Sequence, residues 1–503
     1  EGMYMIGQVA ALRNRVTTMA ELHEAVSESS MEWLSKVQRA EAAAEEPSGP
    51  PLEIAIVGMA CLLPGATDLA TFWDNVLAGS DVTTEVPRER WDWQRYFDGD
   101  RAARDKVYSR WGGFLPEIPF DPLAYGVPPS TLRSIEPLQL LTLEVVRAAL
   151  ADAGLLDREF SRQRASVILG AGGGVADLGN RYAVRATLPS ILDNLPDAVW
   201  EQLPEWTEDS FAGLLLNVAA GRAANRFDLG GINLTVDAAC ASSLAAVYLA
   251  AQELAERRSD VVLAGGVDTA QNPFGYLCFS KTQALSPRGK AAVFDASADG
   301  IVISEGLAVI VLKRLADAER DGDRIYAVLR GVGGSSDGRG RSMTAPRPAG
   351  QVRALERAYR QASYSPATVE LFEAHGTGTA AGDLAEAETL RRVLEAAGAP
   401  PASAAVGSVK SMIGHTKCTA GVTGVIKSAL ALHRKVLPPT INVERPNPKA
   451  GFGDGPLYVN SELRPWLAGS AGHPRRAGVS AFGFGGTNFH VTLEEDAGDP
   501  SSL

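Results

Sequence analysis

The sequence predicts an α/β protein with two comparable halves around a largely parallel, helix-covered sheet. From residue 53 onward, short apolar runs alternate with segments of helical spacing, which is typical of strand–helix–strand units. The later part of the chain restates this alternation, although no short-period repeat is present. A length of 503 residues is also too great for one ordinary core.

The composition narrows the class of protein. The chain carries 60 acidic and 48 basic residues, a net charge of −12. Nucleic acid is therefore not an expected partner, because its binding needs clustered Lys and Arg. No apolar stretch approaches the roughly 18–20 residues that a membrane helix needs, so no membrane span is expected. Residues 1–30 lack the continuous apolar core of a signal peptide.

The four cysteines are few and scattered. They show no C-x-x-C spacing, so we expect neither a metal site nor a disulfide framework, and a reducing cytoplasm is the simplest compartment. Cys61 and Cys278 are interpreted as packing residues.

Residues 1–50 differ in pattern from the rest of the chain and are expected to be a helical docking or linker segment. Apolar positions from Met5 to Val26 follow coiled-coil steps of four and three, and Thr18 with Glu21 resembles a capping box. Residues 45–51 are a linker by composition. Two interpretations stay open, a loosely ordered amphipathic tail and a docking or dimerising helix.

The elements of the first half can be placed in order. Strands are expected at residues 54–60, 167–170, 232–237 and 261–266. Residues 241–250 have helical spacing, and this helix continues to residue 257. Residues 176–216 interrupt the alternation and are expected to form a helical insertion on the surface.

The second half has a similar plan. Strands are expected at 307–312, 325–332, 369–374 and 405–409, with helices at 349–362 and near 418–435. A last strand pair brackets residues 483–488. The glycine run 170–174 is not a dinucleotide-binding motif, because its spacing is wrong and no acidic residue stands at the right distance beyond it.

Cys240 stands at the junction between the predicted strand 232–237 and the helix that comes after it. A helix N-terminus favours a thiolate, so we expect the pKa of this thiol to lie below its free value of about 8.5. His375 and His415 each lie in a glycine-rich turn that would bring an imidazole near the sulfur. A nucleophilic thiol with two histidines indicates acyl transfer.

Several motifs around these residues resemble those of β-ketoacyl synthases. The matching segments are residues 237–244 around Cys240, the run 375–379 followed by Asp383 and Glu386, the run 410–416, and the turn 483–488. Segments 56–61 and 110–114 are similar to ketosynthase domains of type I polyketide synthases. The runs 206–211, 279–282 and 335–339 are most similar to polyunsaturated-fatty-acid-type and related iterative synthases.

The resemblance covers residues 53–495 and implies a thiolase-like fold with layered αβαβα architecture. We divide the chain into an N-terminal half at 51–305, a C-terminal half at 306–495 and a tail at 496–503. The implied reaction is a decarboxylative Claisen condensation between an acyl group on Cys240 and a malonyl-type extender. No acyltransferase, reductase or carrier segment is seen, so the chain is either a discrete protein or a domain of a larger synthase.

The resemblance also implies the roles of individual residues. His375 and His415 face the thioester oxygen on which charge develops, and backbone N–H groups of Cys240 and Phe484 hold the tetrahedral oxyanion. Phe484 also acts as a gate. Lys410 orients and tunes the site with Glu386 as its partner, Asp383 supports it, and Thr377 and Thr379 bind the pantetheine amide.

The implied partners are an acyl carrier protein with its phosphopantetheine arm, acyl and malonyl thioesters, and a second copy of the chain in a homodimer. No cofactor is expected to bind the chain itself. Because carrier proteins are acidic, a basic patch must receive one, and the pairs Arg257–Arg258 and Arg475–Arg476 are candidates.

Two other functions fit the sequence less well. A non-catalytic chain-length or scaffold protein would not need the cysteine, both histidines and Lys410 together. A thiolase would carry a second cysteine in the C-terminal turn, where Phe484 stands.

Three departures from the family pattern are Ala238 before the cysteine, Ser304 in place of a glycine, and Lys417–Cys418 after His415.

Overall fold

The computed structural model describes residues 18–21, 23–24, 50–172, 176–339, 342–467, 472–496 and 498. The chain separates into two units, Glu1–Gly49 and Pro50–Leu503. In the first unit the Thr18 N–H donates to Glu21 Oε2 at 2.8 Å and the Glu21 N–H donates to Thr18 Oγ1 at 3.2 Å, which confirms the capping box. Most of the apolar positions expected to form a coiled-coil pattern, and the linker at 45–49, lie outside the described residues.

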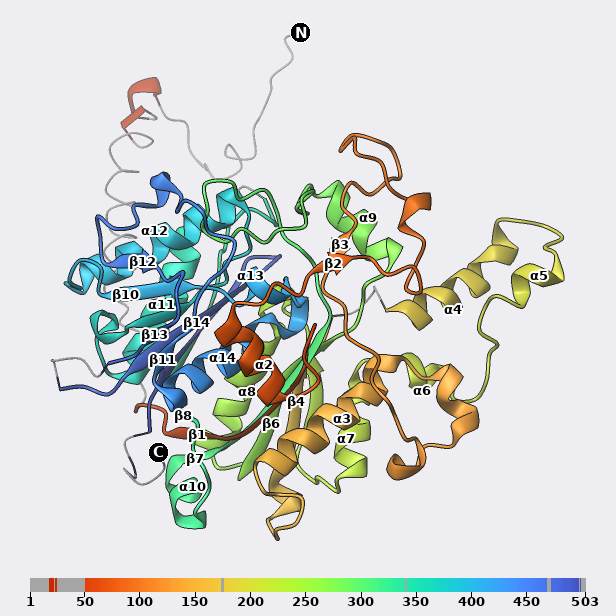
Figure 1. Ribbon diagram of the computed structural model, residues 1–503, viewed down its shortest axis with the longest axis horizontal. Coiled ribbons are helices and arrows are strands. Elements are labelled where there is room, and N and C mark those ends of the chain that lie inside the picture. Colours follow the sequence, from red (N-terminus) through yellow and green to blue (C-terminus); the bar gives the residue numbers. More distant parts are fainter. Residues whose placement is uncertain are drawn as a thin grey trace. The chain divides into compact units, whose positions relative to one another are not determined.

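The second unit is built on one 11-stranded sheet, shown in Figure 1. Its order is β12-β10-β9-β14-β15-β8-β1-β7-β6-β4-β5. The strands are β1 (Ile54–Leu62), β4 (Ala165–Gly170), β5 (Asn233–Val236), β6 (Val261–Asp268), β7 (Gly306–Arg314), β8 (Ala327–Ser336), β9 (Leu371–Glu373), β10 (Ala404–Gly407), β12 (Leu457–Val459), β14 (Arg476–Gly483) and β15 (Thr487–Glu494).

The pairing of these strands reveals two halves with one plan. Strands β1, β4, β5, β6 and β7 occur in the same chain order and with the same neighbours as β8, β9, β10, β14 and β15. The two sets meet where β1 pairs with β8. The expected two-half organisation is therefore present. The division between residues 305 and 306 stays a prediction. Strand β7 begins directly after that division, yet it pairs with β6 and β1 of the first half.

The expectation of a largely parallel sheet was wrong. Strands pair in parallel only in the two flanks, among β6, β4 and β5 and among β14, β9, β10 and β12. The six central strands are antiparallel, and β14 returns as β15 through the tight turn 484–486. Apolar periodicity marks a buried strand but carries no information about its direction.

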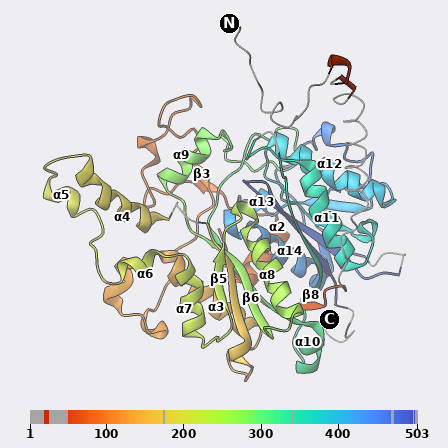
Figure 2. The ribbon, with the colours of Figure 1, turned by 180° about the vertical axis from the view of Figure 1, so that it is seen from behind.

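Helices complete an αβαβα arrangement. Two of them, α8 (Ser242–Ala255) and α14 (Ala420–Arg434), contact each other and strands of both halves, and they form the middle layer. The outer layers are α3 (Pro137–Asp152) with α7 (Asn217–Arg226), and α11 (Pro348–Ala362) with α12 (Ala380–Ala396), as Figure 2 shows from behind.

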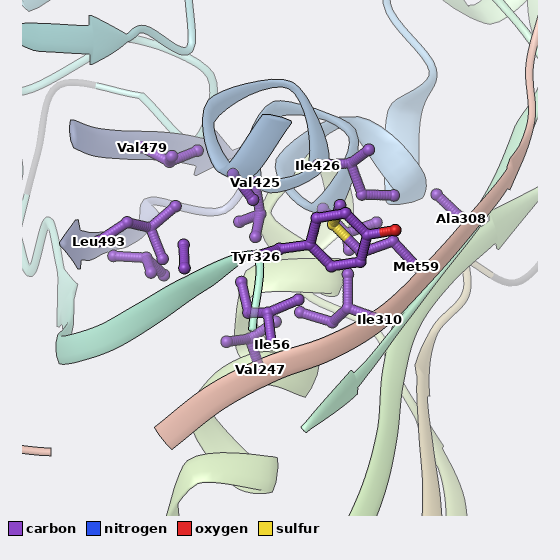
Figure 3. Close-up of a cluster of buried hydrophobic side chains, with 14 of the residues drawn as sticks. Ile56, Met59, Val247, Ala308, Ile310, Tyr326, Val425, Ile426, Val479 and Leu493 are labelled. Carbon is purple, nitrogen blue, oxygen red and sulfur yellow. The ribbon is translucent and has the colours of Figure 1, made fainter. Parts of the chain in front are cut away.

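The middle layer holds the largest apolar core. Figure 3 shows Val247 of α8 and Val425 of α14 among side chains from strands of both halves, including Ile56 of β1 and Val479 of β14. Both helices are apolar on nearly all sides, which is the pattern of a helix covered by sheet on both faces. These two helices begin beside Cys240 and His415, so the core fixes the site.

The remaining described elements surround this frame. They include α2 (Leu69–Ala78), α9 (Pro273–Lys281), α10 (Leu315–Asp321), α13 (Lys410–Ile413) and the small pairs β2 (Thr84–Glu85) with β3 (Trp111–Gly112) and β11 (Val436–Leu437) with β13 (Arg464–Pro465). The expected insertion is helical, with α4 (Asp177–Thr187), α5 (Asp197–Trp200) and α6 (Ser210–Leu214), and it extends away from the sheet in Figure 1. None of the described helices is both long and apolar enough to cross a bilayer.

Candidate active site

Cys240 lies in a strained turn between β5 and α8. Ala239 has φ of +49°, a conformation that non-glycine residues rarely adopt, and residues Ala239–Ala241 form the short 3₁₀ helix η7. Ser242 stabilises the turn, because its hydroxyl accepts from Ala238 N at 2.8 Å and donates to Ala239 O at 2.6 Å. The turn places the thiol immediately before the first residues of α8.

The expected low pKa of this thiol was wrong. Burial raises the pKa of Cys240 to about 11, and the positive charges of Lys410 and Lys417 only partly offset this increase. The carboxylate of Asp268 raises it further. A helix terminus favours the thiolate, but the buried surroundings that the rest of the fold supplies outweigh it. The thiol of the free protein is therefore protonated near neutral pH.

Cys240, His375 and His415 line one cavity of about 280 Å³. His375 comes after β9, His415 precedes α14, and Phe482 with Phe484 come from the end of β14. The two imidazoles meet edge to face, with ring centroids 5.4 Å apart and planes at 83°. The fold thus unites the three side chains that the sequence proposed.

His415 has a defined tautomer. Its Nδ1 accepts a hydrogen bond from the Lys417 backbone N–H at 3.0 Å, so the ring proton of the neutral form is on Nε2. Burial, followed by the charges of Lys410 and Lys417, holds the pKa of His415 well below its usual range. The ring is therefore a neutral Nε2–H donor.

His375 is held through its backbone. Glu386 accepts hydrogen bonds from the N–H groups of His375 and Gly376, both at 2.7 Å. Burial and then the charge of Lys410 keep the pKa of His375 well below its usual range. Its Nδ1 is buried and has no hydrogen-bond partner in the described part of the chain.

Lys410 has a different environment from the one expected. Its side chain is buried and is not part of the cavity lining, and no described carboxylate forms an ion pair with it. Burial lowers the pKa of Lys410, and Glu373 opposes this effect more than Glu386 does. The proposed Lys410–Glu386 partnership is thus only a longer-range attraction, because the Glu386 oxygens are used by backbone amides.

Two threonines expected to bind pantetheine line the cavity. The hydroxyls of Thr377 and Thr379 are 2.9 Å apart. Asp383 lies behind them and accepts from the N–H groups of Thr377 and Gly378, each at 3.1 Å, and of Phe294 at 2.7 Å. Burial raises the pKa of Asp383 to about 7, as it does for Glu386. Both carboxyl groups therefore support the loop 375–379.

Phe484 lies at the cavity mouth and is 43% exposed. Its ring centroid is 6.5 Å from that of Phe279, and its backbone N–H has no acceptor among the described residues. Gly483 explains its position, because a Cβ there would lie 2.2 Å from the Ala238 carbonyl oxygen. Only glycine lets β14 approach the Cys240 turn this closely.

Part of the cavity was not predicted from the sequence. Loop residues Met343, Thr344, Ala345 and Pro346, together with Gln351, also line it. A signal was available, since this loop comes after the carboxyl end of β8, where α/β proteins commonly place binding residues. Lys417 was expected only as a departure from the family pattern, yet it contacts His415.

The expectations for two of the cysteines also have outcomes. Cys61 is buried as expected, whereas Cys278 is exposed on α9 and is not a packing residue. Among the described residues, no group of three or more His, Cys, Asp or Glu side chains could hold a metal ion.

Comparison with known proteins agrees with this geometry. Residues 52–318 match the N-terminal domain of β-ketoacyl synthase and residues 326–444 match its C-terminal domain. One polyunsaturated fatty acid synthase chain from Thraustochytrium is 41% identical over 461 residues, a match that covers 88% of this chain and 16% of that relative. Polyketide synthase PksN of Bacillus subtilis is 36% identical, with 88% of this chain and 8% of the relative covered.

Solved structures show the same likeness. A ketosynthase from module 6 of the Bacillus subtilis bacillaene synthase has a TM-score of 0.78 and 36% identity, covering 89% of this chain and 72% of that one. An oxazolomycin ketosynthase domain from Streptomyces albus has a TM-score of 0.79 and 34% identity, covering 89% and 74%. This chain spans less than a fifth of the length of these two synthase relatives. It has the thiolase-like fold that was expected, and it belongs to the β-ketoacyl synthase family.

Proposed function

We propose that this chain catalyses decarboxylative Claisen condensation in polyketide or fatty-acid-like biosynthesis. An acyl group would be held as a thioester on Cys240 and extended by a malonyl-type unit on an acyl carrier protein. The observation that carries this proposal is the single cavity shared by Cys240, His375 and His415, with Nε2 of His415 fixed as a donor.

The first half-reaction is acyl transfer. The Cys240 sulfur attacks the carbonyl of an acyl thioester, and the proton it loses goes to the departing carrier thiolate. Because the pKa of the thiol is high, Cys240 is protonated before the reaction and loses its proton during acyl transfer. The N–H groups of Cys240 and Phe484 are the donors that would stabilise the tetrahedral oxyanion.

The second half-reaction is carbon–carbon bond formation. A malonyl thioester loses carbon dioxide, and the enolate oxygen accepts a hydrogen bond from Nε2–H of His415 and from His375. The enolate carbon attacks the acyl carbonyl, and the Cys240 thiolate leaves. Neutral donors suit this step, because the buried cavity offers the developing negative charge little water and oriented N–H groups must stabilise it instead.

We propose that the phosphopantetheine arm of a carrier protein enters past Phe484 and contacts Thr377 and Thr379. Three of the four arginines expected to receive the carrier are less suitable, because Arg258 pairs with Glu253, Arg475 with Glu495 and Arg476 with Glu494. Arg347 and Arg353 are better placed beside the mouth. They donate to the carbonyls of Asp337 and Ser336 and form no ion pair with a described carboxylate.

We further propose a homodimer formed through β5. This strand is the last in the sheet order, its residues are partly exposed, and it leads directly into the Cys240 turn. Sedimentation velocity should give twice the mass of the 53.1 kDa chain.

The function can be tested by following the two half-reactions separately. After incubation with a panel of acyl thioesters, intact-mass analysis should show a single acyl adduct, and C240A should show none. Release of carbon dioxide from malonyl carrier protein should require both His375 and His415. A folded protein that forms no adduct would favour the non-catalytic alternative. Equal activity with free coenzyme A thioesters would favour a thiolase.

A further inference from the structure

Lys417 forms a buried ion pair beside the reaction cavity. The side chain is two residues beyond His415, and the residue is 8% exposed. Its ammonium donates to the Ser304 carbonyl at 2.5 Å and lies 3.1 Å from Asp268 Oδ1 at the end of β6, where Asp268 is 6% exposed. A buried ion pair contributes little net stability, because desolvation offsets its attraction. We therefore expect the Asp268–Lys417 pair to have a role other than stabilising the fold.

The backbone of Lys417 is also constrained. It has φ of +51°, an unfavourable conformation for a residue with a side chain. In this conformation its N–H donates to Nδ1 of His415. The Ser304 and Asp268 contacts hold the side chain. Both the backbone N–H and the ammonium of Lys417 are therefore fixed in place.

The same segment contacts the nucleophile. The short helix η9 (Lys417–Thr419) packs against η7, which carries Cys240. After burial, the charges that act on the Cys240 pKa are those of Lys410 and Lys417, which lower it, and of Asp268, which raises it. Cys418 is the other thiol nearby, and burial raises its pKa well above the usual range.

Other groups also face this pair. His375 and His415 line the cavity with Cys240, and both imidazoles are neutral. Glu305 and Asp177 experience the charge of Lys417, which lowers the pKa of each. Within this set, Lys410 and Lys417 are the positive charges, and Lys417 is the one paired with a carboxylate.

We propose that the Asp268–Lys417 pair sets the nucleophilicity of Cys240. In this assignment the Lys417 ammonium stabilises the thiolate that forms during acyl transfer, and Asp268 holds that ammonium in place while limiting its effect. Both are positioning residues, since neither is assigned a contact with substrate. The inference rests on the proposed function and specifies how its nucleophile is tuned.

Alkylation of Cys240 by iodoacetamide tests the proposal. Its rate is followed by intact mass between pH 7 and pH 10 in the full chain carrying C278S, which removes the exposed thiol. Below the thiol pKa the rate is proportional to the thiolate fraction, so a shift of one pKa unit changes it tenfold. We expect K417M to react roughly tenfold more slowly than the parent at every pH below its midpoint. D268N should react faster, and K417R should retain the parental rate within about threefold.

A matched control separates tuning from general damage. K313M breaks another buried ion pair, that of Lys313 with Asp323, at the opposite end of β7 from the η9 contact. It should lower the melting temperature without changing the alkylation rate. A folded K417M protein that reacts at the parental rate would overturn the proposal. If K417M does not fold, a D268N rate equal to or below the parental rate would do so.

Alkylation is independent of the proposed function. It needs no acyl or malonyl substrate, so a failure of tuning appears as an unchanged rate. A failure of the condensing function would appear as absent carbon dioxide release with alkylation intact.

Discussion

Burial controls the protonation of the individual residues in the site. It raises the pKa of Cys240 to about 11 and those of Asp383 and Glu386 to about 7, and it lowers the pKa values of both histidines. Each direction favours the neutral form, as expected for groups removed from water. In the proposed mechanism, oriented donors such as Nε2–H of His415 are then the main means of stabilising a developing anion.

The first prediction concerns His415. H415A removes the fixed donor, so carbon dioxide release should fall by roughly 10²–10³-fold. Acylation of Cys240 should fall much less, because the proposed mechanism assigns the oxyanion of that step to backbone N–H groups. Gas release and intact mass measure the two rates. H473A, outside the cavity lining, should change neither rate. Equal losses in both steps for H415A would argue against the assignment.

A second prediction concerns Glu305, which accepts from Arg90 and Leu115 N through Oε2 while Oε1 is buried without a described partner. Burial raises its pKa to about 7 from 4.5. A carboxyl pKa raised on folding contributes stability below about pH 4.5 that is lost as pH rises through about 7. The upper limit of this loss is on the order of 3 kcal/mol.

The variant E305Q should therefore remove part of the pH dependence. Its carbonyl oxygen can keep the two hydrogen bonds, and its amide group occupies the unpartnered position. Chemical denaturation between pH 5 and pH 8 should show a smaller loss of unfolding free energy than in the parent. Parallel pH profiles for the two proteins would contradict this explanation.

At the scale of elements, the active site depends on the close approach of β14 to the Cys240 turn. G483A would place a methyl group 2.2 Å from Ala238 O, so the strand must move. We expect a lower melting temperature and at least a tenfold loss of Cys240 acylation, in line with a misplacement of about 1 Å. G99A meets nothing within 4 Å and should behave like the parent. An unaffected G483A protein would show that this approach is unimportant.

The start of α11 gives a prediction about the carrier. R347E and R353E reverse two charges beside the cavity mouth, so KM for malonyl carrier protein should rise severalfold and the increase should diminish at high salt. Malonyl pantetheine, which lacks the carrier protein, should react at the parental rate. R258E reverses an arginine already paired with Glu253 and should leave KM unchanged. A larger increase in KM for R258E than for R347E and R353E would show that the carrier docks elsewhere.

At the scale of the whole molecule, a buried ion pair joins the middle layer to the sheet. Lys427 of α14 pairs with Glu373 of β9 at 2.7 Å, and Glu373 also accepts from Val409 N at 2.6 Å. Both ionic groups are almost completely buried. This pair therefore links the central helix to the strand that precedes His375.

Breaking this pair should damage the molecule globally. K427M leaves the Glu373 carboxylate without its cation, so the unfolding free energy should fall by about 3–5 kcal/mol. The double variant K427M/E373Q should recover part of that loss, because no buried charge remains unpaired. Denaturant titration measures both values. A double variant less stable than K427M would exclude this electrostatic origin.

Sequence was a good guide to the strands and the candidate residues, for reasons that particular elements make clear. Strands β1, β4, β6 and β7 are continuous apolar runs, so periodicity located them within a few residues. Strand direction was predicted wrongly because it depends on long connections, such as the one between β6 and β7. Lys417 was overlooked because its partners Asp268 and Ser304 are far away along the chain, and Ser304 is separated from it by 113 positions.

The amino-acid sequence by itself determined the chemical type of this protein. It placed one thiol before a helix and put two histidines and two threonines in glycine-rich turns, and those choices are local. The tertiary structure alone decided the shared cavity, the amide-bound role of Glu386 and the protonated state of Cys240. Solvation and long-range charge set these properties, and both depend on residues from distant segments that only folding brings together.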